Sequence, residues 1–344
     1  MPLRKDNTGT LPYAFEPNST INYSRGWKLQ SVRHRRVNNF GFISDQDYAV
    51  QDPRPLIAIV GDSFIEAMQV DYADTAEAQL NRMLGNKARV YSFGAAFAPL
   101  SQYLAWSGYV SSTFYPRLLV VNVVGNDFDE SVLQLQRLGR GGSTPGMNFF
   151  DFNDGLGELV RVPFYEEGLG ISLLRKSALA SYLVRNINIT DLRDIREFGK
   201  RISAKESRPA VFVGNTAAQA DAERLRLSKL AVDFFLDQLP VTTGMPSRDI
   251  VISIDGERPE VYGATLQTGQ AESYFTIMRN YLINRAQRRG HTIIDLRKCF
   301  IVDYKRNHRK FEFPDDGHWN VEGHRVLSES LYDLAQVKDL LGQR

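Results

Sequence analysis

Five short apolar runs set the strongest constraint on the fold of this chain. Each is rich in β-branched residues and nearly continuous in apolar character, as expected of a strand buried on both faces of a sheet. The expected strands are residues 56–60, 88–93, 117–124, 249–254 and 291–296. Because strands that are open to water on one face alternate apolar and polar residues, these runs predict a parallel sheet covered on both sides.

Helical patterns separate and follow these runs. Apolar residues recur at helical spacing over residues 75–84, 99–113, 217–239, 270–289 and 321–341. Strands that alternate with helices predict an α/β fold with a doubly wound, five-stranded parallel sheet and helices on both faces. In such folds, ligands bind at the carboxyl ends of the strands.

Two regions depart from this rhythm. Residues 1–50 are polar and rich in turn formers, so we expect an N-terminal arm laid over the edge of the sheet. Residues 51–344 then form the α/β domain, with an insertion at about 128–245 between the third and fourth strands. The insertion holds a glycine-rich loop, 139–146, without the Lys-Ser/Thr ending of a phosphate-binding loop, and a helical stretch, 171–194, expected as a cap over the active face.

Composition limits the partners. The 344 residues include 42 basic and 40 acidic side chains, a formal charge of +2, which gives no electrostatic reason to expect nucleic acid. A small molecule or a neutral polymer fits better as the substrate. Cys299 is the single cysteine, which excludes an intrachain disulfide and argues against a cysteine-based metal site.

The sequence assigns no compartment and no oligomeric state. Its apolar runs have the length of strands, so no membrane segment is expected in this chain, and the first 25 residues lack the apolar core of a signal peptide. The protein is expected to be cytoplasmic if Met1 is the native start. It is expected to be periplasmic or extracellular if an N-terminal anchor or signal has been removed.

Four polar or glycine-containing segments follow or lie near the strands and can supply the parts of a serine hydrolase. Such an enzyme needs a nucleophilic hydroxyl, a base, a carboxylate that orients the base, and donors for the developing oxyanion. The segments are Gly61-Asp62-Ser63, Gly94, Gly125-Asn126-Asp127 and Asp315-Asp316-Gly317-His318.

Each segment also has a purely structural interpretation. Ser63 directly follows a strand and precedes a helix, but Asp and Ser are common in turns and helix caps, and the Gly-x-Ser-x-Gly elbow is absent. Asn126 can donate its amide to an oxyanion at the same sheet edge, yet it also lies in a turn-forming tripeptide. Gly94 allows a backbone N–H to approach a ligand closely, whereas a lone glycine after a strand is usually structural.

His318 is the strongest candidate base among the five histidines. Asp315 and Asp316 lie three and two residues before it, and a carboxylate at this distance can hold one ring nitrogen protonated while the other accepts a proton. The alternative is an exposed histidine in a turn. His324 is expected to pack or to cap a helix, and a metal site made of Asp316, His318 and His324 is not expected. We expect no metal and no cofactor.

Together, these four segments resemble the four sequence blocks of the SGNH or GDSL hydrolase superfamily, in order and in strand context. The resemblance covers roughly residues 50–130 and 245–344 and leaves the arm and the insertion outside. It implies that Ser63 is the nucleophile and His318 the base. It also implies an oxyanion hole formed by the backbone amides of Ser63 and Gly94 with Asn126, and a sheet order of 2-1-3-4-5.

The resemblance leaves the triad acid open between Asp315 and Asp316. Many members place the acid three residues before the histidine, but those with Asp-x-His-Trp, including alginate acetyltransferase-like proteins, place it two before. The run from Gly317 to His324 is more similar to the second group, which favours Asp316. That group includes enzymes that move acetyl groups on and off polysaccharides.

The sequence therefore predicts a serine esterase that cleaves an O-acyl ester, with O-acetyl on a carbohydrate as the favoured substrate. If a sugar hydroxyl instead of water resolves the acyl-enzyme, the same residues make an O-acyltransferase. A non-catalytic carbohydrate-binding protein on the same scaffold is the second alternative.

Overall fold

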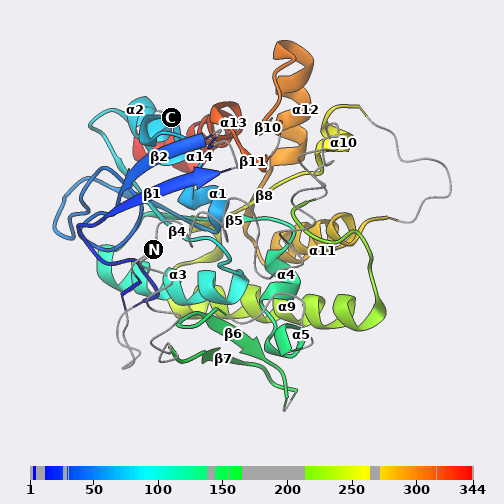
Figure 1. Ribbon diagram of the computed structural model, residues 1–344. Coiled ribbons are helices and arrows are strands. Elements are labelled where there is room, and N and C mark those ends of the chain that lie inside the picture. Colours follow the sequence, from blue (N-terminus) through cyan, green and yellow to red (C-terminus); the bar gives the residue numbers. More distant parts are fainter. Residues whose placement is uncertain are drawn as a thin grey trace.

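The centre of the computed structural model is a five-stranded parallel sheet with the order β4-β3-β5-β8-β9 (Figure 1). The structure describes residues 3–4, 12–25, 29, 31–137, 144–153, 155–164, 214–263, 272–314 and 316–342. The sheet strands are β3 (Leu56–Gly61), β4 (Arg89–Gly94), β5 (Leu118–Val123), β8 (Ile250–Ile254) and β9 (Thr292–Asp295). Numbered along the chain, this order is 2-1-3-4-5, so the predicted doubly wound α/β fold is confirmed.

Successive residues of each strand enter two separate cores. In β3, Ala58 and Val60 belong to one core and Ile57 and Ile59 to the other, and all four are fully buried. Among the helices that contribute to the first core are α3 (Leu100–Phe114), α9 (Ala222–Thr243) and α11 (Tyr274–Arg288). Among those that contribute to the second are α2 (Ala76–Leu84), α12 (Leu296–Asn307), α13 (Val321–Tyr332) and α14 (Ala335–Leu340). Helices therefore cover both faces of the sheet.

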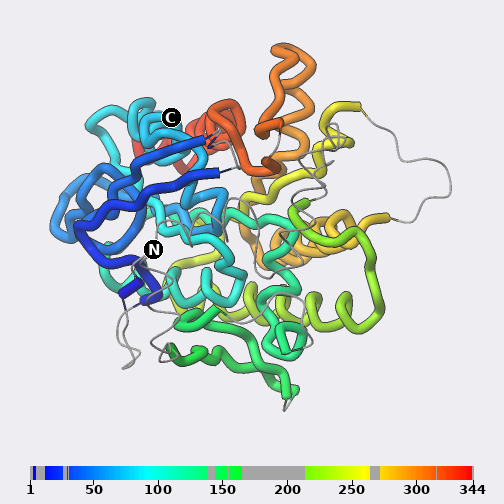
Figure 2. The backbone as a smooth tube through the Cα atoms, viewed as in Figure 1, coloured from blue at the N-terminus to red at the C-terminus, as the bar shows by residue number. Residues whose placement is uncertain are grey.

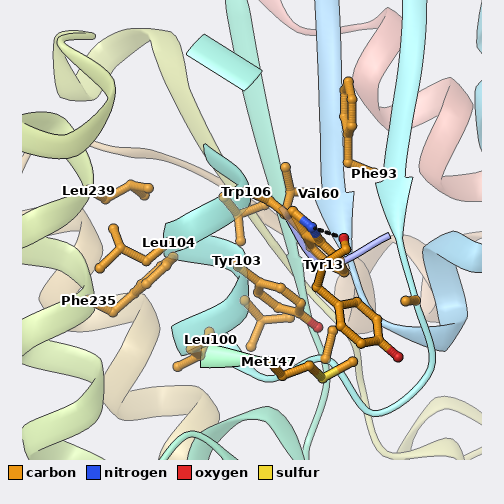
Figure 3. Packing of buried hydrophobic residues seen from close by; sticks show 14 of the residues in the cluster. Tyr13, Val60, Phe93, Leu100, Tyr103, Leu104, Trp106, Met147, Phe235 and Leu239 are labelled. Atoms are coloured by element: carbon orange, nitrogen blue, oxygen red, sulfur yellow. Dashed lines mark hydrogen bonds between the residues drawn. The ribbon is translucent and has the colours of Figure 1, made fainter. Parts of the chain in front are cut away.

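Figure 3 shows the first core at close range. Side chains of α3 lie between sheet residues such as Val60 and α9 residues such as Phe235, and Trp106 donates its indole N–H to the backbone oxygen of Tyr13 at 2.8 Å. This buried hydrogen bond fixes the backbone of the arm at Tyr13 to the first core.

Two features near the carboxyl terminus differ from the sequence prediction. The fifth strand ends at Asp295, which caps the N-terminus of α12. Leu296, which the sequence analysis assigned to the strand, starts this helix of 12 residues, and the sequence analysis did not predict the helix. The helix expected over 321–341 is divided by an extended residue, Leu334. Leu331 and Val337 are both fully buried, and six residues of continuous helix would place them on different faces.

The N-terminal arm contains strands that the sequence did not indicate. β1 (Thr20–Arg25) and β2 (Ser31–Arg36) form an antiparallel hairpin whose side chains include many charges. The arm then covers the outer edge of β4: Tyr48 exchanges hydrogen bonds with the backbone of Ser92 at 2.7 and 3.0 Å, and Gln46 donates to the oxygen of Val90 at 2.7 Å. These bonds satisfy backbone groups that an edge strand would otherwise leave open.

Helix α9 lies within the predicted bounds of the insertion, and the described part of the insertion that precedes it packs beside α3 and α9. This part includes α4 (Asp127–Glu130), α5 (Leu133–Arg137) and a hairpin of β6 (Asn148–Asp151) and β7 (Glu158–Arg161). The helical stretch expected at 171–194 and most of the glycine-rich loop, 139–146, lie outside the described residues.

The remaining elements are short and mostly lie near the candidate site. They are α1 (Ser63–Glu66), η1 (Tyr72–Asp74), η2 (Ser247–Asp249), α10 (Arg258–Val261), β10 (Glu312–Phe313) and β11 (Asp316–Trp319). In the tube view, the dark blue N-terminal hairpin reaches toward the orange-red segment that carries β11 (Figure 2). Over the described ranges, none of the helices combines the length and apolar character needed to cross a bilayer.

Glu77 joins the arm to the sheet and gives a pH-dependent prediction. Its carboxyl group is 3% exposed and accepts hydrogen bonds from Ser44, Gln46 and Ser92. Burial raises its pKa to about 7 from an ordinary 4.5, against the effect of these bonds. The protonated form therefore stabilises the fold fully below pH 4.5, and this contribution is lost as the pH rises to about 7.

Replacing Glu77 with Gln should remove this titration. Between pH 5 and pH 8, the free energy of unfolding of the parent should fall by about 3 kcal/mol more than that of Glu77→Gln. Denaturant titrations at both pH values measure the difference, with Glu158→Gln, an exposed glutamate on β7, as the control. An identical pH dependence in parent and Glu77→Gln would show that Glu77 titrates normally in the folded protein.

Candidate active site

Ser63 lies at a tight junction between β3 and α1. Asp62 caps α1, and its Oδ1 accepts the N–H of Phe64 at 2.9 Å. A Cβ at Gly61 would lie 2.3 Å from the side chain of Ile65, and one at Gly94 would lie 2.6 Å from the backbone nitrogen of Glu66. Both positions therefore require glycine for the helix to start directly against the ends of β3 and β4.

A chain of hydrogen bonds links Ser63, His318 and Asp316. Nε2 of His318 lies 2.8 Å from Oγ of Ser63, and Nδ1 of the same ring lies 2.6 Å from Oδ1 of Asp316. Asp316 and His318 belong to β11, which pairs with β10. Ser63 is 9% exposed, and the side chain of His318 is 23% exposed.

The chemistry of these groups fixes the direction of the bonds. An ionised carboxylate only accepts, so Nδ1 of His318 carries the hydrogen and Nε2 presents its lone pair to Ser63. Oγ of Ser63 also lies 3.3 Å from Oδ2 of Asp62, but the shorter contact with His318 is the better bond for its single hydrogen. The arrangement can withdraw a proton from the Ser63 hydroxyl.

His318 is held in place by its aromatic neighbours. The ring of Phe64 lies 4.8 Å from the imidazole, centroid to centroid. Trp319 is buried and donates its indole N–H to Oδ1 of Asp255 at 3.3 Å, at the end of β8. Asp255 is also paired with buried Arg258 at 2.9 Å. The β11 segment is thereby fixed to the carboxyl edge of the sheet.

Two buried carboxyl groups flank Ser63. Burial raises the pKa of Asp62 to about 6 and that of Glu66 to about 7; His318 lowers both, and a bond from the backbone of Ala96 lowers that of Glu66. Oε1 of Glu66 is buried without a hydrogen-bond partner in the described part of the chain. A carboxyl group in this setting is easier to keep protonated than ionised.

The pKa of His318 is lowered, chiefly by burial and further by the cation of Arg25. The nearby Asp62 and Glu66 act in the opposite direction. Because burial dominates, the imidazole is neutral at pH 7, which is the form that can accept a proton.

The side chain of Asn126 is oriented at both ends. Its Nδ2 donates to Oε2 of Glu130 at 2.7 Å, and its Oδ1 accepts from Nδ2 of Asn215 at 3.0 Å. Burial raises the pKa of Glu130 to about 7, opposed by the bond from Asn126. One amide hydrogen of Asn126 is thus used by Glu130, which leaves the second as a donor for a ligand.

Asn215 belongs to a segment of the insertion that buried Arg224 fixes to the domain. Arg224 pairs with Asp129 at 2.7 Å, donates to the backbone oxygens of Ala217 and Gln219, and lies 3.4 Å from the ring centre of Tyr274. These contacts place the segment beside α4, where Asn126 begins the helix.

The structure brings some of the candidate residues together and leaves others apart. Ser63, His318 and Asp316 are joined directly, and Gly94 packs against α1. Asn126 makes its two side-chain bonds within the described residues to Glu130 and Asn215. Asp315 lies outside the described residues, so the choice between Asp315 and Asp316 stays a prediction.

Sequence reasoning missed several groups around this site. Arg25, from the N-terminal hairpin, pairs with Oδ2 of Asp316, and nothing in the sequence of the arm indicates this contact. For Glu66, the one sequence feature that could have indicated a buried acidic group near Ser63 is its place directly after the apolar pair Phe64-Ile65. Across the described ranges, no group of three or more His, Cys, Asp or Glu side chains is arranged to hold a metal ion.

No protein-family model matches the chain, and no curated protein sequence matches it. Solved structures do match in fold at low sequence identity. The lipase/acylhydrolase from Enterococcus faecalis is 11% identical, with a TM-score of 0.41, over 84% of this chain and 96% of its own.

Two further solved structures show the same level of similarity. A member of the lipolytic G-D-S-L family from Veillonella parvula is 9% identical with a TM-score of 0.41, over 81% of this chain and 97% of its own. The acetyl xylan esterase AlAXEase is 10% identical with a TM-score of 0.39, over 80% of this chain and 98% of its own. These values describe what the chain is similar to and do not bear on the chemistry of the site.

Proposed function

We propose that this protein is a serine hydrolase that cleaves an O-acyl ester through a covalent acyl-enzyme. The observation that carries the proposal is the continuous hydrogen-bond chain from Ser63 through His318 to Asp316. These hydrogen-bonded side chains lie where β3 ends, at the carboxyl edge of a parallel sheet, which is where α/β folds bind their ligands.

Each of these three side chains has a defined part in the proposed reaction. Oγ of Ser63 attacks the ester carbonyl carbon while Nε2 of His318 takes its proton, and Asp316 stabilises the resulting imidazolium through the Nδ1–H bond. The tetrahedral intermediate collapses as His318 returns the proton to the leaving alcohol, which leaves the acyl group on Ser63. His318 then takes a proton from a water molecule that attacks the acyl carbon. As the bond between the acyl carbon and Oγ of Ser63 breaks, His318 returns this proton to Oγ and the acid is released.

The proposed oxyanion donors are the backbone amides of Ser63 and Gly94 and the side chain of Asn126. Ser63 is the first residue of α1, where backbone N–H groups have no partner within the helix. The bonds of Asn126 to Glu130 and Asn215 preorganise its amide, which is the property that makes such a donor effective.

An acetyl group on a carbohydrate is the substrate we propose. It is supported by the resemblance of the Asp316-to-His324 run to acetyltransferase-like proteins. Transfer to a sugar hydroxyl instead of water is the second candidate, because the Ser63 acyl-enzyme is common to both reactions and the acceptor decides the product.

The proposal is tested by hydrolysis of p-nitrophenyl acetate, butyrate and octanoate beside acetylated glycans, with released acetate and acetylated acceptor measured separately. We expect the acetate ester to be preferred. Ser63→Ala should abolish turnover and labelling by a fluorophosphonate, since the triad acts as one unit. Ser112→Ala, at an exposed serine on α3, should retain both. A folded parent with neither turnover nor label would instead support a non-catalytic carbohydrate-binding protein.

Asn126→Ala should lower kcat by about 10²–10³ with little change in KM, because the amide is proposed to bind the oxyanion and not the ground state. Steady-state kinetics with p-nitrophenyl acetate measure this. Asn153→Ala, in the β6–β7 hairpin of the insertion, is the matched control and should leave kcat unchanged. A change confined to KM would contradict the oxyanion role.

Alanine at Asp315 and at Asp316 gives a direct comparison of the two candidate acids. Asp316→Ala should lower kcat by orders of magnitude, because it removes the acceptor that fixes the imidazole tautomer, whereas Asp315→Ala should retain most activity. Circular dichroism of both variants controls for folding. The reverse ranking would place the acid three residues before His318 and would weaken the carbohydrate-acetyl proposal that depends on the Asp-x-His-Trp resemblance.

A further inference from the structure

The N-terminal hairpin contributes a cation to the triad. Arg25 is the last residue of β1, and its guanidinium forms an ion pair with Oδ2 of Asp316. The other carboxylate oxygen of Asp316, Oδ1, accepts from the imidazole and from the backbone N–H of His318. The two oxygens of the carboxylate are therefore held from two separate segments of the chain.

The hairpin that presents Arg25 is fixed beside the nucleophile. β1 and β2 pair over six positions, from Thr20 with Arg36 to Arg25 with Ser31. Arg35 is 2% exposed and donates to the backbone oxygens of Ala67 and Val70, in the segment that follows α1. The register of the hairpin and the anchor at Arg35 together set where Arg25 can reach.

We propose that Arg25 is a positioning residue for the reaction, and that the N-terminal hairpin thereby completes the active site. This rests on the proposed function, since it assigns Arg25 a role through Asp316 and His318. The guanidinium locks the carboxylate in the orientation in which Oδ1 meets Nδ1 of His318, so the imidazole presents Nε2 to Ser63. A bidentate-capable, permanently charged group suits this task better than a neutral donor.

A second consequence concerns the base strength of His318. The charged or titratable groups that face it are Asp316 on β11, Asp62 and Glu66 at α1, Arg25 on β1 and His324 on α13. Burial lowers the pKa of His324 to about 3, so it carries no charge at neutral pH. Arg25 is then the one cation of this set that opposes the imidazolium, which keeps His318 in its base form at lower pH.

The test compares Arg25→Gln and Arg25→Lys with the parent. In Arg25→Gln, kcat for p-nitrophenyl acetate should fall about 10-fold, as for other groups that orient a functional side chain. The acid limb of the kcat/KM profile should also move to higher pH, since the imidazolium has lost an opposing charge. Arg25→Lys keeps the charge, so its acid limb should stay at the parental position.

Arg36→Gln is the matched control. Arg36 lies on β2 with a side chain 38% exposed, close to the 35% of Arg25, and it pairs with Asp47 at 2.6 Å. It should leave both kcat and the acid limb as in the parent. Thermal unfolding of each variant shows whether the hairpin still folds.

The pKa of His318, followed by NMR through its ring proton and identified by its loss in His318→Asn, provides a measurement that needs no turnover. It should rise in Arg25→Gln and stay at the parental value in Arg25→Lys. A parent that is inactive on every ester would overturn the proposed function, whereas this titration still reports on Arg25. Parental kcat with an unchanged pKa of His318 in Arg25→Gln would overturn the positioning role.

Discussion

The hydrogen bond between Nε2 of His318 and Oγ of Ser63 joins residues 255 positions apart, and much of the structure serves to hold its two ends. On one side, Gly61 and Gly94 permit α1 to start against the sheet, where a side chain would collide with the turn. On the other, Trp319 and Asp255 attach β11 to the end of β8. A hydrogen bond weakens steeply with distance and angle, so both ends must be fixed to within a few tenths of an ångström.

Burial of acidic groups is the main cost of this arrangement. Asp62, Glu66 and Glu130 lie near the site, and burial raises the pKa of each to between about 6 and 7. Replacing such groups with apolar residues would remove the penalty of desolvation, but it would also remove the cap of α1 and the partner of Asn126. These carboxyl groups therefore lower the stability of the fold above neutral pH, where they ionise. Two of them, Asp62 and Glu130, also orient α1 and the side chain of Asn126.

The sequence predicted the sheet because its signal is local. Strands buried on both faces, such as residues 56–60, need continuous apolar runs, and helices between them need a period of 3.6, so both patterns can be seen without knowledge of contacts. The order of the motifs also placed Ser63 and His318 at one edge of the sheet, and their side chains are hydrogen-bonded; their catalytic roles stay a prediction. Helix α12 was not predicted, and its first residue was assigned to the strand, because Asp295 both ends β9 and caps α12.

What the sequence did not predict depends on contacts between distant segments. Nothing in the charged strand β2 indicates that Arg35 is buried against the end of α1, and nothing in β1 indicates that Arg25 reaches Asp316. Asn215 could not be linked to Asn126, because the two lie 89 positions apart, with the whole β6–β7 hairpin between them. Ion pairs and amide contacts of this kind leave no periodic trace, so only the folded chain identifies them.

The electrostatic balance at His318 links the N-terminal arm to the residues that we propose as catalytic. Ionised Asp62 and Glu66 would stabilise an imidazolium, whereas burial and Arg25 destabilise it. A base that is too weak cannot take the proton of Ser63, and one that is too strong is already protonated at working pH. The pKa of His318, on β11, is therefore set jointly by burial, by Arg25 of the arm and by Asp62 and Glu66 at α1, which are far apart in the sequence. A substitution in the arm or at α1 can therefore change the pKa of His318, and with it the pH range in which the imidazole can accept the proton of Ser63.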